Sequence, residues 1–165
     1  MPKSQRPIRI EGDTAFIQLT KGYTTAIDVA DVALAEGRNW CSLIAPHTVY
    51  AQGKINNKTV FLHRLLLGFP SGLDVDHIDG DGLNNRRSNL REATRSQNLR
   101  NQRVSKDSAS GLKGITWYPD RAKWGARIKV DGRRLWLGLY ETPESAHAAY
   151  VAASAEHHAE FGRSA

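Results

Sequence analysis

The sequence predicts an α+β protein with a β-rich N-terminal region, a central strand–loop–strand–helix unit, and a C-terminal three-stranded antiparallel sheet packed on one helix. Three observations lead to this prediction. Short apolar runs separated by turn-forming residues fill residues 1–58. A loop rich in Asp, Gly and Asn divides two short apolar segments within residues 59–104. Three segments of strand length precede an alanine-rich segment within residues 112–163.

The N-terminal region is expected to consist of short strands joined by turns. Glu11-Gly12-Asp13 separates the first two strands, and Lys21-Gly22 leads into a third. Asp28 is a candidate N-cap for a short helix over residues 29–36, which would end near Gly37. The expected strands cover residues 8–10, 14–19, 23–27, 40–44, 49–52 and 59–62.

The central unit is organised around a polar loop. Its first feature is an apolar run at residues 62–67, which Gly68 and Pro70 stop. Small and polar residues at 105–111 are expected to link this unit to the C-terminal part. The expected elements between them are a strand at 73–78, a loop at 79–85, a return strand at 90–92, and a helix from Thr94 or Ser96 to about Arg103.

The C-terminal part reads as three antiparallel strands and a helix. Strands are expected at 113–118, 123–130 and 133–140, with Asp131-Gly132 as a hairpin turn and Pro143 in the first turn of a helix ending near His158. Alternation predicts one apolar face formed by Trp124, Ala126, Ile128, Val130, Leu135, Leu137 and Leu139, packed on Ala146, Ala149, Tyr150 and Ala153. The opposite face would carry Thr116, Tyr118, Arg127, Lys129, Arg134, Trp136 and Tyr140. Trp117 and Trp124 are expected in the core.

Composition excludes several classes of protein. The 165 residues include one cysteine, Cys41, so there is no internal disulfide and no multi-cysteine zinc site. No apolar run approaches the roughly 18 residues that span a bilayer, and the N-terminal residues do not form a secretory signal. A reducing, cytoplasmic setting is expected, with no membrane partner and no disulfide partner.

The distribution of charge indicates a polyanionic partner. The net charge is +6, and residues 86–134 hold fourteen lysines and arginines against four acidic residues. Such a basic band is either a solvated surface or a footprint for nucleic acid, and its richness in arginine favours nucleic acid. The N-terminal region, which contains no catalytic pattern, would then support the rest or touch DNA itself.

The pattern with the clearest chemistry begins at Val75-Asp76-His77-Ile78-Asp79-Gly80, on a strand that leads into the loop. It continues through Asn89 on the return side and Asn98 on the closing helix. Carboxylate and amide oxygens are suited to a hard divalent cation, and a neutral imidazole can take a proton from water. Because adjacent strand residues point to opposite faces, Asp76 and His77 can share a site only where the strand twists or ends.

Plainer interpretations exist for each of these residues. Asp76 and His77 could mark a strand end with a salt-bridged histidine, although Asn89 and Asn98 favour a catalytic site. His63, beside an apolar run, is more readily a packed structural histidine than a second catalytic group. The remaining candidates are Asp79, Asp81, Asn84 and Asn85, expected to be turn residues first, and Arg95, Arg100 and Arg103, which are solubilising charges or phosphate contacts.

Residues 60–103 resemble the HNH nuclease motif, the ββα-metal finger of group I intron homing endonucleases and phage HNH enzymes. The resemblance rests on His-Arg-Leu-Leu-Leu at 63–67, Val-Asp-His-Ile-Asp-Gly at 75–80 and Asn-Asn-Arg-Arg-Ser-Asn-Leu-Arg at 84–91. It implies that His77 is the general base and that Asp76 and Asn98 bind a divalent metal, Mg²⁺ or alternatively Mn²⁺. It also implies that Asn89 holds the loop by hydrogen bonds to the backbone and so orients His77.

Residues 111–162 resemble the Apetala-type, or ethylene-response-factor, DNA-binding domain. The matching segments are Lys113-Gly114-Ile115, residues 123–128, Leu135-Trp136-Leu137-Gly138 and residues 146–150. In that family the sheet enters the major groove of double-stranded DNA. The implied DNA-binding positions are Lys113, Thr116, Tyr118, Arg127, Lys129, Arg134 and Trp136, with Arg95 and Arg100 added from the central unit. Thr116 and Tyr118 stand where plant domains place arginines, so base preference does not transfer.

Together the two resemblances imply a homing-type DNA endonuclease of phage or intron origin, acting in the host cytoplasm. It would hydrolyse phosphodiesters to leave 5′-phosphate and 3′-hydroxyl ends. With one motif per chain, a monomer would nick one strand and a weak dimer could cut both. The rival hypothesis is a non-catalytic, sequence-specific DNA-binding regulator. An RNA-binding protein is a third hypothesis, which the absence of RNA-module motifs disfavours.

Overall fold

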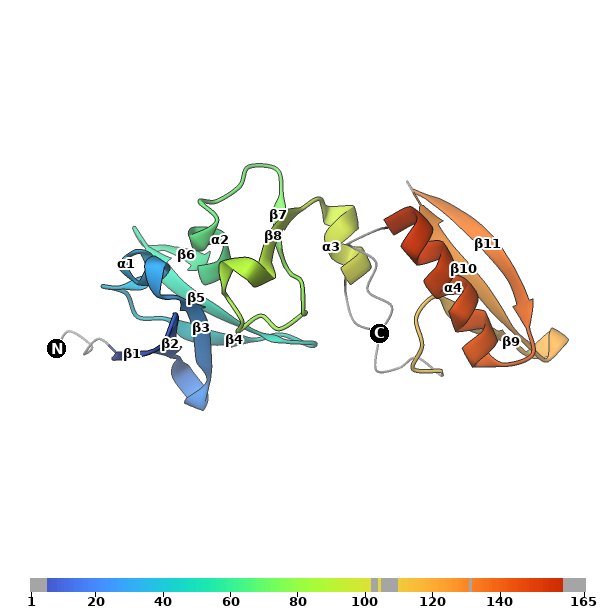
Figure 1. Cartoon of the computed structure of the whole chain (residues 1–165), viewed down its shortest axis with the longest axis horizontal. Helices are drawn as coiled ribbons and strands as arrows, with labels where there is room; N and C mark the ends of the chain where they lie inside the picture. Colours follow the sequence, from blue (N-terminus) through green and yellow to red (C-terminus); the bar gives the residue numbers. More distant parts are fainter. Residues whose placement is uncertain (1–5, 102–103, 105–109, 131, 159–165) are drawn as a thin grey trace. The chain divides into compact units, whose positions relative to one another are not determined.

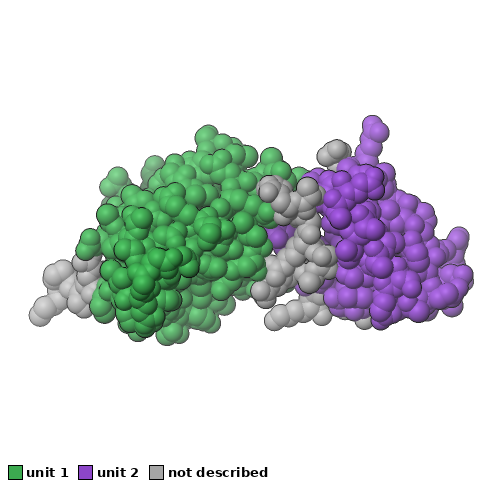
Figure 2. Space-filling model, in the orientation of Figure 1, with its two compact units in different colours: residues 1–98 green, residues 99–165 purple. Residues whose placement is uncertain are grey.

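The computed structural model describes residues 6–101, 104, 110–130 and 132–158, and the chain divides into two compact units. Unit 1 comprises residues 1–98 and unit 2 comprises residues 99–165 (Figure 2). The chain mixes helices and antiparallel sheets, as the sequence predicts (Figure 1). Most of the expected linker, residues 105–109, and the expected end of the central helix, residues 102–103, lie outside the described residues.

Unit 1 begins with two antiparallel sheets of three strands each. The first has the order β1-β2-β3 and the second the order β4-β5-β6. Their bounds are Ile8–Glu11, Thr14–Gln18 and Thr24–Asp28 for the first sheet, and Cys41–Ile44, Val49–Ile55 and Lys58–Phe61 for the second. Strand β5 runs further than expected because Asn56 and Asn57, both with positive φ, form a tight hairpin turn into β6.

The helical segments of unit 1 are short. A 3₁₀ turn occupies Thr20–Gly22, and α2 occupies the apolar run Leu62–Leu66. The helical segment expected over residues 29–36 is present but divided, because a 3₁₀ turn at Val29–Asp31 precedes a four-residue helix α1 at Val32–Ala35. Asp28 does not cap it. Its carboxylate instead accepts hydrogen bonds from Arg86 Nε at 2.9 Å and from the Arg87 backbone N–H at 2.8 Å.

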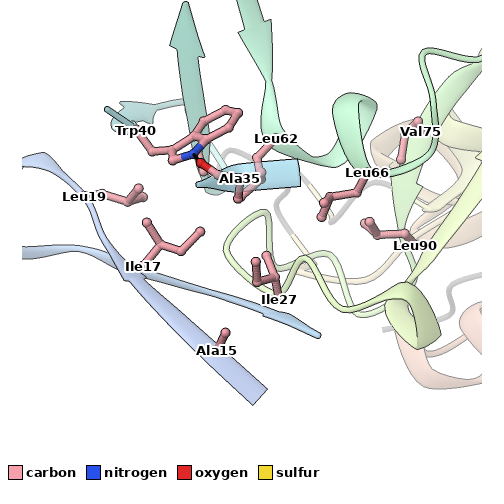
Figure 3. Close-up of a cluster of buried hydrophobic side chains, with 11 residues drawn as sticks. Ala15, Ile17, Leu19, Ile27, Ala35, Trp40, Leu62, Leu66, Val75 and Leu90 are labelled. Carbon is pink, nitrogen blue, oxygen red and sulfur yellow. Dashed lines mark hydrogen bonds between the residues drawn. The ribbon is translucent and has the colours of Figure 1, made fainter. Parts of the chain in front are cut away.

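The predicted strand–loop–strand segment packs against these two sheets within unit 1. Strand β7, Asp74–His77, pairs antiparallel with β8, Leu90–Ala93, after a 3₁₀ turn at Arg87–Asn89, and helix α3 follows at Arg95–Asn101. Val75 and Leu90 from this pair belong to the same buried cluster as Ile17, Ile27 and Trp40 from the N-terminal region (Figure 3). Residues 8–60 therefore share one hydrophobic core with the segment that carries the candidate site.

Unit 2 is a three-stranded sheet with one helix across a face. The order is β11-β10-β9, with β9 at Ile115–Tyr118, β10 at Lys123–Val130 and β11 at Arg133–Tyr140. A 3₁₀ turn at Pro119–Arg121 joins β9 to β10. Helix α4, Pro143–His158, crosses one face of this sheet (Figure 1). Its Tyr150 and Ala153 pack against Ile128, with Leu137 beside them. No helix among the described residues is long and apolar enough to cross a membrane.

A β-bulge in β11 changes which residues share a face. Ala126 pairs with Gly138 but Arg127 pairs with Trp136, so Leu137 is the extra residue. Beyond the bulge, Leu139 lies opposite Gly125 and Tyr140 lies opposite Trp124. The expectation that Leu139 shares the apolar face, and that Tyr140 shares the basic one, is therefore wrong, because one inserted residue reverses the alternation.

Trp117 departs from its expected place in the core. Its side chain is 41% exposed, and its ring lies 5.2 Å from that of Trp124, the residue with which it pairs across β9 and β10. Trp117 is thus one half of a partly solvated pair of rings rather than a core aromatic.

Gly114 offers a test of the packing in unit 2. A Cβ atom at Gly114 would lie 2.0 Å from the Tyr150 ring, and its φ of +78° already disfavours a side chain. We expect Gly114→Ala to destabilise unit 2 by about 3 kcal/mol, because backbone strain and overpacking add. Urea unfolding followed by tryptophan fluorescence measures this, since three of the four tryptophans lie in unit 2.

Gly111→Ala is the matched control, because Gly111 has a similar φ of +64° but no atom within 4 Å of the place where a Cβ would lie. It should cost only about 1 kcal/mol, the strain alone. Equal losses for the two variants would contradict the packing of Gly114 against Tyr150.

Candidate active site and nucleic-acid interface

His77 is the last residue of strand β7, and its imidazole packs against neighbouring aromatic rings. Its side chain is 5% exposed. The ring centroid of His63 is 5.0 Å away in an edge-to-face arrangement, and that of Tyr50 is 5.9 Å away. Phe61 stacks on His63 at 5.2 Å. These partners come from β5, β6 and α2, so the second N-terminal sheet and its following helix shape the surroundings of His77.

Asn85 lies within hydrogen-bonding distance of the His77 ring, and the sequence did not reveal this contact. Its Oδ1 lies 3.1 Å from His77 Nε2. Asn85 is fully buried, and its Nδ2 lies 2.7 Å from Thr25 Oγ1 and 3.2 Å from the Gly82 carbonyl oxygen. In the sequence, Asn85 stands in a run of turn-forming residues, and no spacing distinguishes it from Asn84.

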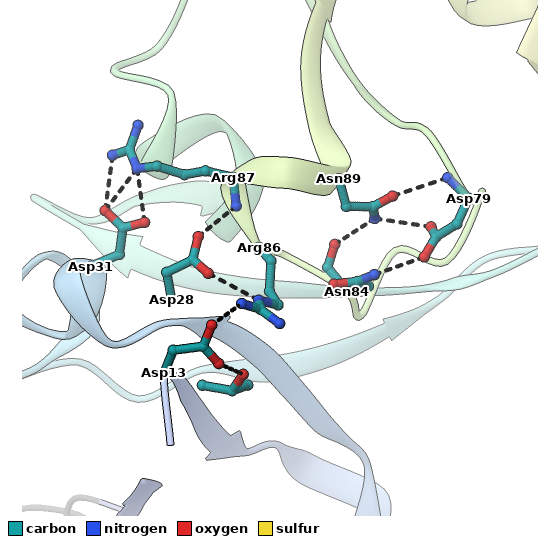
Figure 4. A network of polar contacts seen from close by, with 9 residues as sticks. Asp13, Asp28, Asp31, Asp79, Asn84, Arg86, Arg87 and Asn89 are labelled. Atoms are coloured by element: carbon teal, nitrogen blue, oxygen red, sulfur yellow. Dashed lines mark hydrogen bonds and ion pairs between the residues drawn. The ribbon is translucent and has the colours of Figure 1, made fainter. Parts of the chain in front are cut away.

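Asn89 holds the loop from the other side. Its Nδ2 donates to Asp79 Oδ1 at 2.9 Å and to the Asn84 carbonyl oxygen at 2.8 Å, while its Oδ1 accepts the Asp79 backbone N–H at 3.0 Å (Figure 4). Asp79 also accepts a hydrogen bond from the Asn84 side chain at 2.8 Å. The backbone contacts expected of Asn89 are thus present, and they brace the loop that follows His77.

The N-terminal region fastens this loop. The Leu83 carbonyl oxygen accepts hydrogen bonds from the Ala26 backbone N–H at 2.9 Å and from the Thr25 hydroxyl at 2.7 Å. Gly82 lies against β5, where an added Cβ would be 2.5 Å from the Val49 carbonyl oxygen. The loop therefore requires glycine at this position because two backbones approach closely.

Asp76 and Asn98, the expected metal ligands, each have a charged or polar neighbour. Asp76 is 5% exposed, and its Oδ2 lies 2.9 Å from Arg91 Nε. Asn98 Nδ2 donates to Oδ2 of Asp74 at 3.0 Å, and Arg95 Nη1 lies 3.3 Å from the same atom. Asp74 and Asp76 are two positions apart in β7, so their side chains lie on the same face of the strand. Asn98, which donates to Asp74, therefore lies on the face that carries Asp76.

The chemistry of this pair fits a hard divalent ion. Because the amide nitrogen of Asn98 is turned to the Asp74 carboxylate, the amide oxygen is the atom left as a ligand. A carboxylate and an amide oxygen are ligands that Mg²⁺ and Mn²⁺ accept. Among the described residues, no group of three or more His, Cys, Asp or Glu side chains is arranged to hold a metal ion.

Burial keeps the two histidines uncharged at neutral pH. Burial lowers the pKa of His77, although the hydrogen bond to Asn85 and the nearby Asp79, Asp76 and Asp81 oppose the shift. Burial also lowers the pKa of His63 to about 3, with smaller contributions from His77 and Arg64. A neutral His77 can accept a proton, and the surrounding carboxylates would stabilise the imidazolium that results.

In unit 2, the side of the sheet away from α4, here called the open face, carries most of the expected DNA-binding residues. Arg127, Lys129 and Arg134 are exposed, and Trp136 is 53% exposed. Tyr118 and Trp136 meet edge to face at 5.8 Å over Gly125. The face is completed by Thr116, whose hydroxyl lies 3.4 Å from Arg127 Nη2.

The remaining basic residues are more constrained than the sequence suggests. At the start of the basic segment, residues 86–134, the arginines are paired with carboxylates. Arg86 pairs with Asp13 and Asp28, and Arg87 pairs with Asp31 (Figure 4). Arg91 pairs with Asp76. Of the other expected DNA contacts, Arg95 lies beside Asp74, and the Lys113 ammonium donates to the Arg100 carbonyl oxygen.

Comparison with known proteins bears on unit 1. Residues 61–100 match the family model described as HNH endonuclease. This segment contains Asp76, His77, Asn89 and Asn98, the four residues singled out from the sequence.

A curated relative, Protein 3.8 of Escherichia phage T7, is 38% identical over 65 residues. The match covers 39% of this chain and 54% of the phage protein, so the chain spans about half the length of this relative. No solved structure matches the chain significantly. The Apetala-type resemblance of unit 2 stays a prediction, since the family match ends at residue 100.

His63 gives a testable link between pH and stability. Its pKa is about 3 when folded and 6.5 for an unperturbed histidine. The unfolded chain therefore binds more protons between these values, and stability is lost as pH falls below 6.5. We expect His63→Phe, which keeps the aromatic contact, to remove about 2 kcal/mol of the loss of stability between pH 7 and pH 5.

Urea unfolding of both proteins over this pH range measures the difference. The carboxylates are common to both chains and cancel in the comparison, whereas the smaller electrostatic contribution of His77 is lost together with the His63 imidazole. Parallel curves of stability against pH would show that His63 is not a buried neutral histidine.

Proposed function

We propose that this protein is a metal-dependent DNA endonuclease of the HNH type, in which His77 takes a proton from the water that attacks a phosphodiester. The supporting observation is a buried, uncharged imidazole, anchored by Asn85 within the segment that matches HNH endonucleases. Such a group has the protonation state that a general base needs near neutral pH.

Asp76 and Asn98 are proposed to hold Mg²⁺, with Mn²⁺ as a substitute. The ion, when bound, supplies positive charge that stabilises the phosphate and the leaving oxygen. Asp74 keeps the oxygen of Asn98 available by engaging its amide nitrogen, and that hydrogen bond lowers the pKa of Asp74. Asn89 and Asp79 brace the loop, so that His77 keeps its position while it gains a proton.

The open face of unit 2 is proposed to bind double-stranded DNA. Arg127, Lys129 and Arg134 offer cations for phosphates or guanine edges, and Trp136 and Tyr118 offer apolar surface between them. Lys113, Thr116, Arg95 and Arg100 are proposed as further contacts. We further propose a homing-type enzyme of phage or intron origin, acting in the host cytoplasm as a monomer that nicks or a weak dimer that cuts both strands.

Plasmid cleavage tests the catalytic proposal. With Mg²⁺ the wild-type protein should nick or linearise supercoiled plasmid, and a chelator should stop it. His77→Ala should lower the cutting rate by about 10²- to 10⁴-fold while DNA affinity changes only a few-fold, because a general base contributes little to holding the duplex. Asp76→Ala should also lose activity, and excess metal should restore part of it.

His47→Ala is the matched control, since His47 is an exposed histidine of the same unit. A His77→Ala protein that cuts at the normal rate would end the assignment. A wild-type protein that binds plasmid but leaves it intact with either metal would be the DNA-binding regulator instead.

Salt dependence tests the open face. If Arg127, Lys129 and Arg134 each neutralise a phosphate, the slope of log affinity against log salt should be about −3. Arg127→Ala or Arg134→Ala should flatten it by about one unit if the residue contacts a phosphate, or relax sequence preference if it reads a base. Binding titrations at several salt concentrations, on specific and random DNA, separate the two effects.

Arg133→Ala is the matched control, because Arg133 is an exposed neighbour paired with Val130 on the other face of the sheet. It removes the same charge but should leave the slope almost unchanged. Identical effects of Arg133→Ala and Arg134→Ala would show that the open face does not bind DNA.

A further inference from the structure

Thr25 starts a chain of hydrogen bonds whose direction is fixed. It lies in strand β3 and is fully buried. Its hydroxyl is 2.7 Å from the Leu83 carbonyl oxygen, which can only accept, so the single hydroxyl hydrogen points there. Oγ1 of Thr25 therefore has only lone pairs to offer to its other neighbour, Nδ2 of Asn85 at 2.7 Å.

This direction determines how the amide of Asn85 is turned. Nδ2 gives one hydrogen to Thr25 Oγ1 and the other to the Gly82 carbonyl oxygen at 3.2 Å. A flipped amide would place Oδ1 against two acceptors that have no hydrogen to give, in a fully buried position. Leaving buried polar groups unpaired costs roughly 1–3 kcal/mol each, so the flipped form is excluded. Oδ1 must therefore face His77.

The last link concerns the ring nitrogens of His77. Asn85 Oδ1 has no hydrogen, and it lies 3.1 Å from His77 Nε2, so Nε2 must carry the hydrogen. The neutral ring then has its lone pair on Nδ1. We propose that Thr25 and Asn85 are positioning residues that hold His77 in the Nε2–H tautomer, so that Nδ1 is the nitrogen that receives the proton from water.

The assignment of Nδ1 as the proton acceptor rests on the proposed function, because it takes His77 as the general base. The chain of hydrogen bonds from Thr25 through Asn85 to His77, here called the relay, gives the N-terminal sheet a part in positioning His77. Thr25 is 52 positions from His77 in the chain but only two hydrogen bonds away in the fold. The relay adds to the expectation drawn from the sequence, in which Asn89 orients His77 by holding the loop.

Nitrogen-15 NMR of the full-length, metal-free protein at pH 7.5 tests the tautomer directly. Long-range proton–nitrogen correlations distinguish Nε2–H from Nδ1–H in a neutral histidine. We expect His77 to show a protonated Nε2 and an unprotonated Nδ1. A protonated Nδ1 would overturn the inference whatever the nuclease activity.

The pair Thr25→Val and Thr25→Ser tests the relay. Serine keeps the hydroxyl, so its cutting rate and His77 tautomer should match the wild type. Valine keeps the shape but leaves Asn85 Nδ2 without its acceptor, so a share of the Nδ1–H tautomer should appear and cutting should fall about tenfold, the scale of lost outer-sphere support. Loss of stability alone would lower the melting temperature without moving the tautomer signals.

The outcomes separate this inference from the proposed function. If the wild type shows Nε2–H but does not cut plasmid, the proposed function fails and the relay stands. If it cuts plasmid while Thr25→Val and Thr25→Ser have the same tautomer and the same rate, the relay fails and the proposed function stands.

Discussion

The loop between β7 and β8 is held to the N-terminal sheet by two adjacent arginines, and the placement of the candidate site depends on this attachment. Arg87 forms a forked ion pair with Asp31, whose side chain is only 4% exposed, and it also donates to the Leu66 carbonyl oxygen at 2.8 Å. Arg86 reaches Asp28 and Asp13. Because the loop has few apolar side chains, these charge-assisted bonds supply the order that packing alone would not.

The same interactions explain why a count of basic residues overstates the surface available to DNA. The first two arginines of the segment that looks most basic in the sequence, Arg86 and Arg87, pair with carboxylates that lie far away in the chain. Pairing is invisible in a linear count, because Asp13, Asp28 and Asp31 precede the basic segment by more than 50 residues. Free positive charge is therefore found on the sheet of unit 2, at Arg127, Lys129 and Arg134.

Local patterns predicted the elements well, and contacts between distant segments account for what they missed. The strands of both units follow alternation and turn residues, as β10 and β11 show. The bulge at Leu137 could not be foreseen, since the apolar alternation Leu135, Leu137, Leu139 continues through it. Asp28 was predicted to cap a helix because it directly precedes the helical segment. Its actual partners, Arg86 and Arg87, lie more than 50 residues away and leave no local signal.

The candidate site shows the same division. The motif from Val75 to Asn98 is local enough to single out His77, Asp76, Asn89 and Asn98 from the sequence. Thr25 and Tyr50 reach His77 only through the tertiary fold, whereas Asn85 lies inside the motif but stands among turn-forming residues that give it an ordinary structural explanation. Side chains that contact His77 from outside its motif leave no periodic or spacing signal.

The contact of Tyr118 and Trp136 over Gly125 has a consequence for the thermodynamics of recognition. A Cβ at position 125 would lie 2.5 Å from either ring, so both aromatic side chains rest on bare backbone and against each other. Their rotamers are therefore fixed before any ligand arrives, and association need not freeze them. If the open face binds DNA as proposed, these rings add little to the entropic cost of association, whereas the exposed side chains of Arg127 and Arg134 become ordered on contact.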